Sequence, residues 1–194
     1  MSATPPPITI AEAHERIRAI IGTTYDCPLS RNKGKPGLLL ETLTGIPNTS
    51  NCLDCADGEI KSFPLVRNKA GALVPKETVA VTMLDRTQLS THAFQDSKCY
   101  NKLRRTLYVP YFRDGDRVTF LEPRLILLDE HPDILAKLQA DYDAIRSQFQ
   151  TDGTLASRNG VYLQNRTKGA GHGSTSRAFY LRKSFLTEFV LNSE

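Results

Sequence analysis

The chain has 194 residues, of which 40% are hydrophobic and 24% charged, with a net charge of +4 from 25 basic and 21 acidic residues. These values are typical of a globular domain with its own core. No apolar run reaches the roughly 20 residues that span a bilayer, which excludes a membrane-spanning protein. The Pro-rich start, residues 1–7, lacks the features of a signal peptide, so we expect a cytoplasmic protein with reduced cysteines.

The first predicted element is a helix over residues 8–21, where apolar positions recur at helical spacing. Thr9 is its expected N-cap, and Glu12, three residues on, is the expected capping-box partner. A polar loop follows at residues 31–35. The next run, Gly37-Leu-Leu-Leu-Glu-Thr-Leu, then predicts a short helix in which Glu41 stands among leucines.

Residues 53–65 predict a strand with Glu59 and Lys61 on one face, because side chains two apart in a strand point the same way. Asn68-Lys-Ala-Gly is typical of a turn. The alternating, β-branched residues 77–83 predict the strand that pairs with the first one.

The second half of the chain alternates between strands and helices. Strands are expected at residues 106–112, 118–121 and 125–128, a long amphipathic helix at 131–149, and a strand, a glycine-rich loop (169–176), a strand and a helix within 160–191. There is no internal repeat and no clean linker. The pattern therefore predicts a mixed α/β chain with one core, arranged as two lobes.

Basic residues gather near the C-terminus. Between Gly153 and Thr187 there is no acidic residue, whereas this stretch holds six basic ones: Arg158, Arg166, Lys168, Arg177, Arg182 and Lys183. Such a segment is typical of a surface that faces a polyanion. A basic face that is merely solvated is an equally simple explanation, as it is for the pair Arg104 and Arg105.

The segment that points to chemistry is Asp54-Cys-Ala-Asp-Gly-Glu-Ile-Lys61. Its acid, short turn and Glu-x-Lys strand bring carboxylates and an ammonium group together. Close carboxylates repel unless a cation neutralises them, and Mg²⁺ accepts such oxygen ligands with water and phosphate oxygens. Glu41 is a third candidate ligand, and Lys61 would orient a water or hold a phosphate. An ordinary charged strand after a turn has the same pattern. Asp57 competes with Asp54 for the role of metal ligand, although its position before Gly58 suits a turn residue.

A zinc site is a competing interpretation of Cys52-x-x-Cys55 with Cys27 and Cys99. Structural zinc sites use paired knuckles of this kind or histidines at helical spacing. Only one close pair is present here, and the histidines are scattered. We therefore expect reduced, partly buried thiols.

Six blocks in a fixed order carry a family pattern. They are Lys33-Gly-Lys-Pro-Gly-Leu-Leu-Leu-Glu41, Gly58-Glu-Ile-Lys-Ser-Phe-Pro-Leu65, Lys76-Glu-Thr-Val-Ala-Val-Thr82, Asn101-Lys-Leu-Arg-Arg-Thr-Leu-Tyr-Val-Pro110, Gly160-Val-Tyr-Leu-Gln-Asn-Arg-Thr-Lys168 and Arg177-Ala-Phe-Tyr-Leu-Arg-Lys-Ser-Phe185. Together they resemble the MutH family of DNA endonucleases, which is related to type II restriction enzymes such as MvaI and BcnI.

The resemblance implies a restriction-endonuclease-like fold of the PD-(D/E)xK type, with a central mixed sheet flanked by helices and two lobes forming a DNA cleft. It implies one domain over residues 1–194, with a catalytic lobe at about 8–94 and a recognition lobe at about 95–194. In the catalytic role it places Asp54, Glu59, Lys61, Glu41 and Lys102, of which Glu41, Asp54 and Glu59 would bind Mg²⁺. On double-stranded DNA it places Arg166, Lys168 and Tyr180, and we add Arg177 and Arg104.

Two departures from the MutH pattern bear on function. The gap from Asp54 to Glu59 is shorter than in MutH and closer to that of MvaI and BcnI, and Thr167 stands where the family has proline. The shorter gap keeps Asp57 in competition with Asp54. Thr167, together with the compact chain, favours a type II restriction endonuclease that cuts double-stranded DNA at a short site with Mg²⁺. The alternatives are a mismatch-repair endonuclease that nicks hemimethylated sites with a MutL-like partner, and a catalytically silent DNA-binding module. The recognition sequence and the choice between monomer and homodimer stay open.

Overall fold

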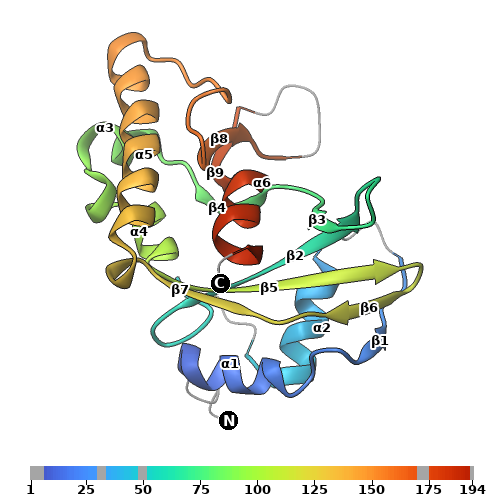
Figure 1. Ribbon diagram of the computed structural model, residues 1–194. Helices are drawn as coiled ribbons and strands as arrows, with labels where there is room; N and C mark the ends of the chain where they lie inside the picture. The colour runs from blue at the N-terminus through green and yellow to red at the C-terminus, as the bar shows by residue number, and fades with distance from the viewer. Residues whose placement is uncertain (1–6, 30–33, 48–51, 170–174, 193–194) are drawn as a thin grey trace. The chain divides into compact units, whose positions relative to one another are not determined.

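The computed structural model describes residues 7–29, 34–47, 52–169 and 175–192 (Figure 1). The chain divides into two compact units, residues 1–76 with 105–126 and residues 77–104 with 127–194. The expected lobes follow the order of the chain, whereas this division is discontinuous, because a strand hairpin after residue 104 joins the sheet of the first unit. Most of the predicted lead-in at 1–7 and parts of the predicted loops at 31–35 and 169–176 lie outside the described residues.

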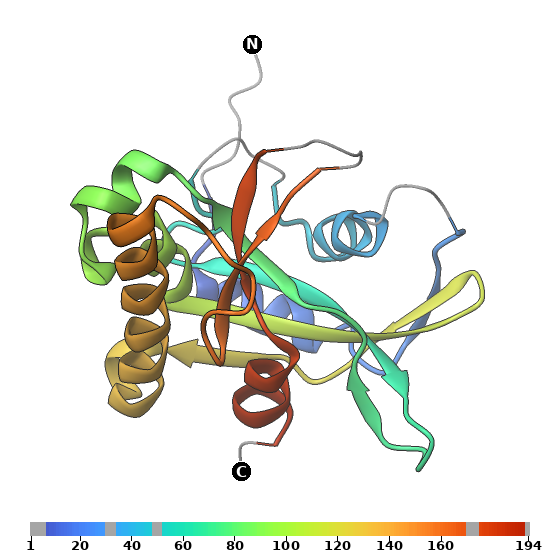
Figure 2. The same cartoon turned by 90° about the horizontal axis from the view of Figure 1, so that it is seen from above.

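The first unit is built on a mixed sheet with strand order β1-β6-β5-β2-β3, and a further strand, β7, pairs with β5 (Figure 2). The strands are β1 (Thr24–Asp26), β2 (Glu59–Arg67), β3 (Leu73–Pro75), β5 (Arg105–Asp114), β6 (Arg117–Phe120) and β7 (Arg124–Leu127). β2 and β5 run parallel, with Glu59 opposite Thr106 and Lys61 opposite Tyr108. The strands predicted at 106–112, 118–121 and 125–128 and the mixed α/β fold are thus confirmed.

The described residues of the first unit form the helices α1 (Ile10–Arg18) and α2 (Lys35–Thr44). The predicted capping box is confirmed: Thr9 accepts a hydrogen bond from the Glu12 backbone, and the Glu12 carboxylate accepts one from the backbone of Thr9. One face of the sheet packs on the apolar faces of these helices. The core there includes Ile10, Ala13, Ile17, Leu40, Leu107, Val109 and Tyr111, with Ile60 packed against it.

Two sequence predictions about strands are wrong. The strand expected at 53–65 begins only at Glu59, because residues before it form a turn. Residues 77–83 do contain a strand, β4 (Val79–Met83), but it pairs with β9 and not with β2. The strand that pairs with β2 across the turn is the short β3. Alternating β-branched residues predict that a segment is a strand, but they do not predict which strand it pairs with.

The second unit has an antiparallel sheet of order β4-β9-β8 and the long helix α5 (Pro132–Asp152) (Figure 1). Its other elements are β8 (Leu163–Thr167), β9 (Arg177–Leu181), α3 (Arg86–Thr91), η1 (Phe94–Asp96), α4 (Lys98–Leu103), η2 (Leu128–Glu130), α6 (Lys183–Phe185) and the π-helical η3 (Leu186–Leu191). Tyr142 on α5 packs between Phe94 and Phe179, with ring centroids 5.3 and 5.5 Å apart. No helix in the described part of the chain is long and apolar enough to cross a membrane.

A buried carboxylate on α5 fixes the segment that leads into β8. Asp141 accepts backbone hydrogen bonds from Val161, Tyr162 and Leu163 at 2.8, 2.6 and 2.8 Å. Gly160, just before them, has a positive φ of 84°, and a Cβ there would collide with the carbonyl oxygen of Leu163. Glycine and aspartate together therefore set where β8 begins.

We predict that Asp141→Asn destabilises the protein by about 1–3 kcal/mol, because an amide replaces one acceptor with a donor that faces backbone N–H groups. Urea unfolding would measure the loss. Asp143→Asn is the matched control: it lies on the same helix but is exposed, so its effect should stay within about 0.5 kcal/mol. Equal effects of the two substitutions would contradict the anchoring role.

Candidate active site and DNA-contacting residues

The turn before β2 is fastened to β5. The backbone N–H of Cys55 donates to the carbonyl of Gly58 at 2.9 Å, which closes the turn. A Cβ on Gly58 would lie 2.9 Å from the carbonyl oxygen of Arg105, too close for any side chain. Only glycine allows this approach, and the first residues of β2 are placed by it.

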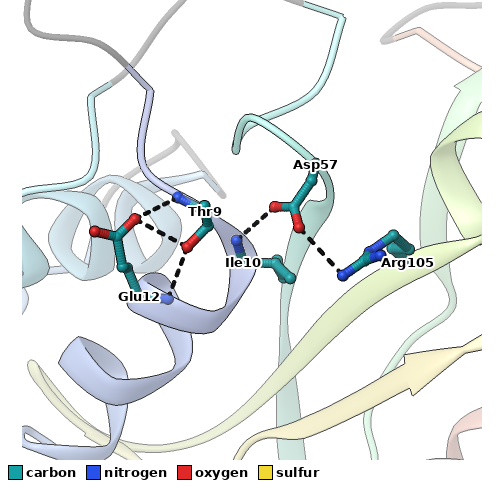
Figure 3. A network of polar contacts seen from close by, with 5 residues as sticks. All are labelled: Thr9, Ile10, Glu12, Asp57 and Arg105. Atoms are coloured by element: carbon teal, nitrogen blue, oxygen red, sulfur yellow. Dashed lines mark hydrogen bonds and ion pairs between the residues drawn. The ribbon is translucent and has the colours of Figure 1, made fainter.

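Asp57 has a structural role in this turn (Figure 3). Its Oδ1 accepts the backbone N–H of Ile10 at 2.7 Å, at the start of α1, and its Oδ2 pairs with Nη2 of Arg105 at 3.2 Å. Figure 3 shows this carboxylate between the first turn of α1, with the Thr9–Glu12 capping box, and β5. Because both oxygens are engaged, the geometry supports Asp54 as the candidate ligand and Asp57 as the turn residue.

Asp54 and Glu41 line one pocket of the first unit. Oδ2 of Asp54 accepts the backbone N–H of Ile60 at 3.0 Å, which holds the carboxylate at the edge of β2. The other lining residues are Gly37, Leu40, Ile46, Pro47, Ile60 and Ser62. The cavity volume of about 60 Å³ is enough for roughly four water molecules. Two carboxylates thus face a space that can hold a hydrated ion, and the sequence analysis missed Ser62 there.

Glu59 and Lys61 form an ion pair, with Lys61 Nζ 2.5 Å from Glu59 Oε1. The Glu59 side chain is 1% exposed and that of Lys61 24%. Neither residue is among those that line the pocket of Asp54 and Glu41, although Ile60, which lies between them in the chain, is. Within the described ranges, no group of three or more His, Cys, Asp or Glu is arranged to hold a metal ion. The three-carboxylate metal set therefore stays a prediction, with two of its members in one pocket.

Arg166 and Tyr180 lie together on the second sheet. In the β8–β9 pairing, Tyr180 is opposite Gln164 and Ala178 is opposite Arg166, so both predicted DNA residues share one face. The Arg166 guanidinium carbon lies 5.5 Å from the centre of the Tyr180 ring, and its Nη1 donates to Thr78 Oγ1 at 2.9 Å. The side chain is held over the ring, and its exposed position allows contact with DNA.

The other predicted DNA residues differ in their surroundings. Arg177 is half-buried and donates to Asn165 Oδ1 at 2.5 Å and to Ser157 Oγ at 3.0 Å, so it also holds the sheet together. Burial and, secondly, the nearby Arg86 lower the pKa of its guanidinium. Lys168 and Arg104 are exposed. Lys102 stands in the last turn of α4 in the second unit, and its role at the phosphate stays a prediction.

All four cysteines are free thiols. Cys27, Cys55 and Cys99 are buried, and Cys52 is exposed. Burial and, less strongly, the charge of Asp54 raise the pKa of Cys55 to about 12, and burial alone raises that of Cys99. Burial therefore favours the protonated form of these two thiols.

Fold and site together define an α/β protein with an acidic pocket at the edge of a mixed sheet. The family model described as DNA mismatch repair enzyme MutH matches residues 48–129. The DNA mismatch repair protein MutH of Shewanella sp. (strain W3-18-1) is 30% identical over 228 aligned residues, covering 99% of this chain and 98% of the relative. That of Vibrio vulnificus (strain YJ016) is 28% identical, covering 97% and 96%.

The chain belongs to the MutH family. The resemblance stated from its six sequence blocks is confirmed, and the restriction-endonuclease-like fold class follows from the family. Among solved structures, a complex of the restriction endonuclease MvaI with its cognate DNA substrate aligns with a TM-score of 0.46 and 11% identity, covering 91% of this chain and 94% of that one.

The two aspartates of the turn should respond oppositely to the same substitution. Asp54→Asn keeps an acceptor for the Ile60 N–H but removes a pocket charge, so we expect DNA cleavage to fall by more than about 100-fold at unchanged stability. Asp57→Asn removes the partly exposed ion pair with Arg105, so stability should fall by up to about 1 kcal/mol while cleavage stays within roughly twofold. Plasmid cleavage rates and thermal unfolding measure both. The reverse pattern would assign the ligand role to Asp57.

Thiol alkylation tests the cysteine environments. At about pH 8, iodoacetamide should modify exposed Cys52 first, whereas Cys55 and Cys99 should react only after unfolding, because burial holds them as thiols. Since the folded pKa of Cys55 lies above its ordinary value, its contribution to stability should be lost as the pH rises from about 9 towards 12. Mass spectrometry locates the labels. Rapid labelling of Cys55 in the folded protein would rule out this burial.

Proposed function

We propose that the protein is a metal-dependent DNA endonuclease of the MutH type, which nicks one strand of double-stranded DNA at hemimethylated sites. The observation that carries this proposal is the shared pocket of Glu41 and Asp54, beside the strand of Glu59 and Lys61, in a member of the MutH family. The named relatives over nearly the whole chain are mismatch repair proteins, which favours the mismatch-repair alternative over the type II restriction enzyme that the sequence analysis expected.

The donor chemistry of the pocket fits a divalent cation. Mg²⁺ binds through one or two carboxylates and keeps several waters, and the pocket offers the carboxylates of Glu41 and Asp54 with room for water. Asp54 is already held by a backbone N–H donor, so its orientation is set before an ion arrives. When bound, the ion would lower the pKa of a bound water and stabilise charge on the phosphate.

The chain's own residues would then position the reacting groups. Lys61 carries a positive charge that Glu59 holds in place, and its ammonium is the group that would donate to a non-bridging phosphate oxygen. A water oxygen forms a bond to phosphorus and the bond from phosphorus to the 3′-oxygen breaks, so that the hydroxyl of the water stays on the phosphate and its other proton ends on the 3′-oxygen. Glu59 orients the lysine, because a lone ammonium on a flexible stem has many rotamers.

A restriction-type double-strand cut is the second candidate, and Thr167 favours it. This exposed residue ends β8, follows Arg166 directly and lies opposite Arg177. Threonine supplies a backbone N–H and a hydroxyl that the family's proline lacks, so contacts to base edges can differ from those of MutH. A changed target would suit a restriction enzyme, whereas a MutL-like partner belongs only to the first proposal.

Cleavage of supercoiled plasmid distinguishes these functions. With Mg²⁺ and hemimethylated substrate we expect nicked open circles and no linear product. In EDTA we expect no product. Linear fragments with constant ends on unmethylated plasmid would instead establish the restriction enzyme. Retained binding without either product would point to the DNA-binding module or to a missing activator, and would count against the leading mechanism.

Charge-balanced variants test Lys61 and Glu59. Lys61→Met alone leaves the buried Glu59 charge without its ammonium partner, which we expect to destabilise the fold by about 3–5 kcal/mol. Glu59→Gln with Lys61→Met is neutral at both positions, so it should fold and yet cleave more than roughly 100-fold more slowly than wild type. Circular dichroism checks folding. A folded double variant with wild-type cleavage would sink the assigned roles.

A further inference from the structure

A second pocket, formed entirely within the second unit, carries two arginines. It has a cavity volume of about 430 Å³ and is lined by Met83, Leu84, Arg86, Thr175, Ser176 and Arg177. Two strand ends form it: Met83 ends β4 and faces Ala178 of β9, and the Leu84 N–H donates to the Arg177 carbonyl at 2.8 Å. The arginines are thus fixed on neighbouring backbone segments.

The lining favours an anion. No acidic residue is among the described residues that line the pocket, whereas two guanidinium groups and two hydroxyl side chains are. The neighbouring Asp85 is engaged elsewhere, because its Oδ1 accepts the N–H groups of Thr87 and Gln88 at the start of α3. The two arginines also act on each other, since the charge of Arg86 contributes to the lowered pKa of Arg177. A bound anion would relieve this repulsion.

The donors available suit a phosphate oxygen. Arg177 uses Nε and Nη2 for Asn165 and Ser157, and within the described residues its Nη1 has no hydrogen-bond partner. The pocket is also larger than a free phosphate requires and falls in the range of pockets for small organic ligands. Met83, 48% exposed at the pocket, adds an apolar surface. A phosphodiester with its sugar offers both an anion and an apolar face.

We propose that this pocket, between Arg86 and Arg177, binds a phosphate of the DNA backbone separate from the phosphate that is cleaved. The inference rests on the proposed function, because it takes DNA as the substrate. It adds Arg86, which lies outside the basic stretch of residues 153–187, to the residues that hold DNA. Contacts to phosphates position the protein and carry no base information.

The test measures binding of a fluorescent 30-base-pair duplex by fluorescence anisotropy, in EDTA and over a series of salt concentrations. For Arg86→Ala we expect roughly tenfold weaker binding at low salt, and a slope of log affinity against log salt that is smaller by about one. The loss should be equal for duplexes of different sequence. Arg86→Lys should keep the slope but lose part of the affinity, because lysine keeps the charge without the forked donors.

Arg117→Ala is the matched control, since it removes an exposed arginine at the start of β6 in the first unit and should leave both the affinity and the salt slope close to those of wild type. If wild type binds DNA and Arg86→Ala binds it with the same affinity and salt slope, the inference is overturned while the proposed function stands. If wild type itself binds no duplex, the proposed function fails and the inference with it. Calorimetry with inorganic phosphate separates the sources: Arg86-dependent phosphate binding with Arg86-independent DNA binding would make this a free-anion site and also overturn the inference.

Discussion

The approach of Gly58 to the backbone of Arg105 is the constraint on which the first unit depends. A side chain at this position would meet the carbonyl oxygen at 2.9 Å, so the turn can lie against β5 only because the residue is glycine. Asp57 then joins three elements, since one oxygen accepts the first N–H of α1 and the other pairs with Arg105. The start of β2 follows from this junction, and with it the places of Asp54, Glu59 and Lys61.

Both units fix a functional strand by the same physical means, a carboxylate that accepts backbone N–H groups beside a glycine. Asp57 and Gly58 do this before β2, and Asp141 and Gly160 do it before β8. A carboxylate accepts such bonds more strongly than a neutral oxygen, and it leaves no buried donor unsatisfied. Strands that carry candidate catalytic and DNA-contacting side chains are therefore held at their first residues, while the side chains farther along can meet a ligand.

Local patterns in the sequence predicted most elements but not their partners. The capping box of Thr9 and Glu12 and the apolar face of α5 depend on residues a few positions apart, and both were confirmed. The pairing of β4 with β9 could not be predicted, because it joins residues about 100 positions apart and no local signal encodes it. The candidate site was predictable only in part. Glu-x-Lys identified one strand face, but the pocket of Glu41 and Asp54, with Ser62 in its lining, depends on how α2 packs. Arg86 stands alone in the sequence, and only the strand pairing brings it to Arg177.

The distribution of charge explains why such a protein needs two separate surfaces. Glu59 and Lys61 neutralise each other, so the carboxylates of Glu41 and Asp54 set the local charge of their pocket, which attracts a cation but repels a polyanion. In the proposed endonuclease, attraction for DNA would come from elsewhere, and the second unit would supply it through a stretch with no acidic residue between Gly153 and Thr187. Binding to phosphates in that unit can offset the repulsion at the acidic pocket. A divalent metal ion would neutralise the two carboxylates and remove this repulsion, so the affinity for DNA and the occupancy of the metal site would be linked, each increasing the other.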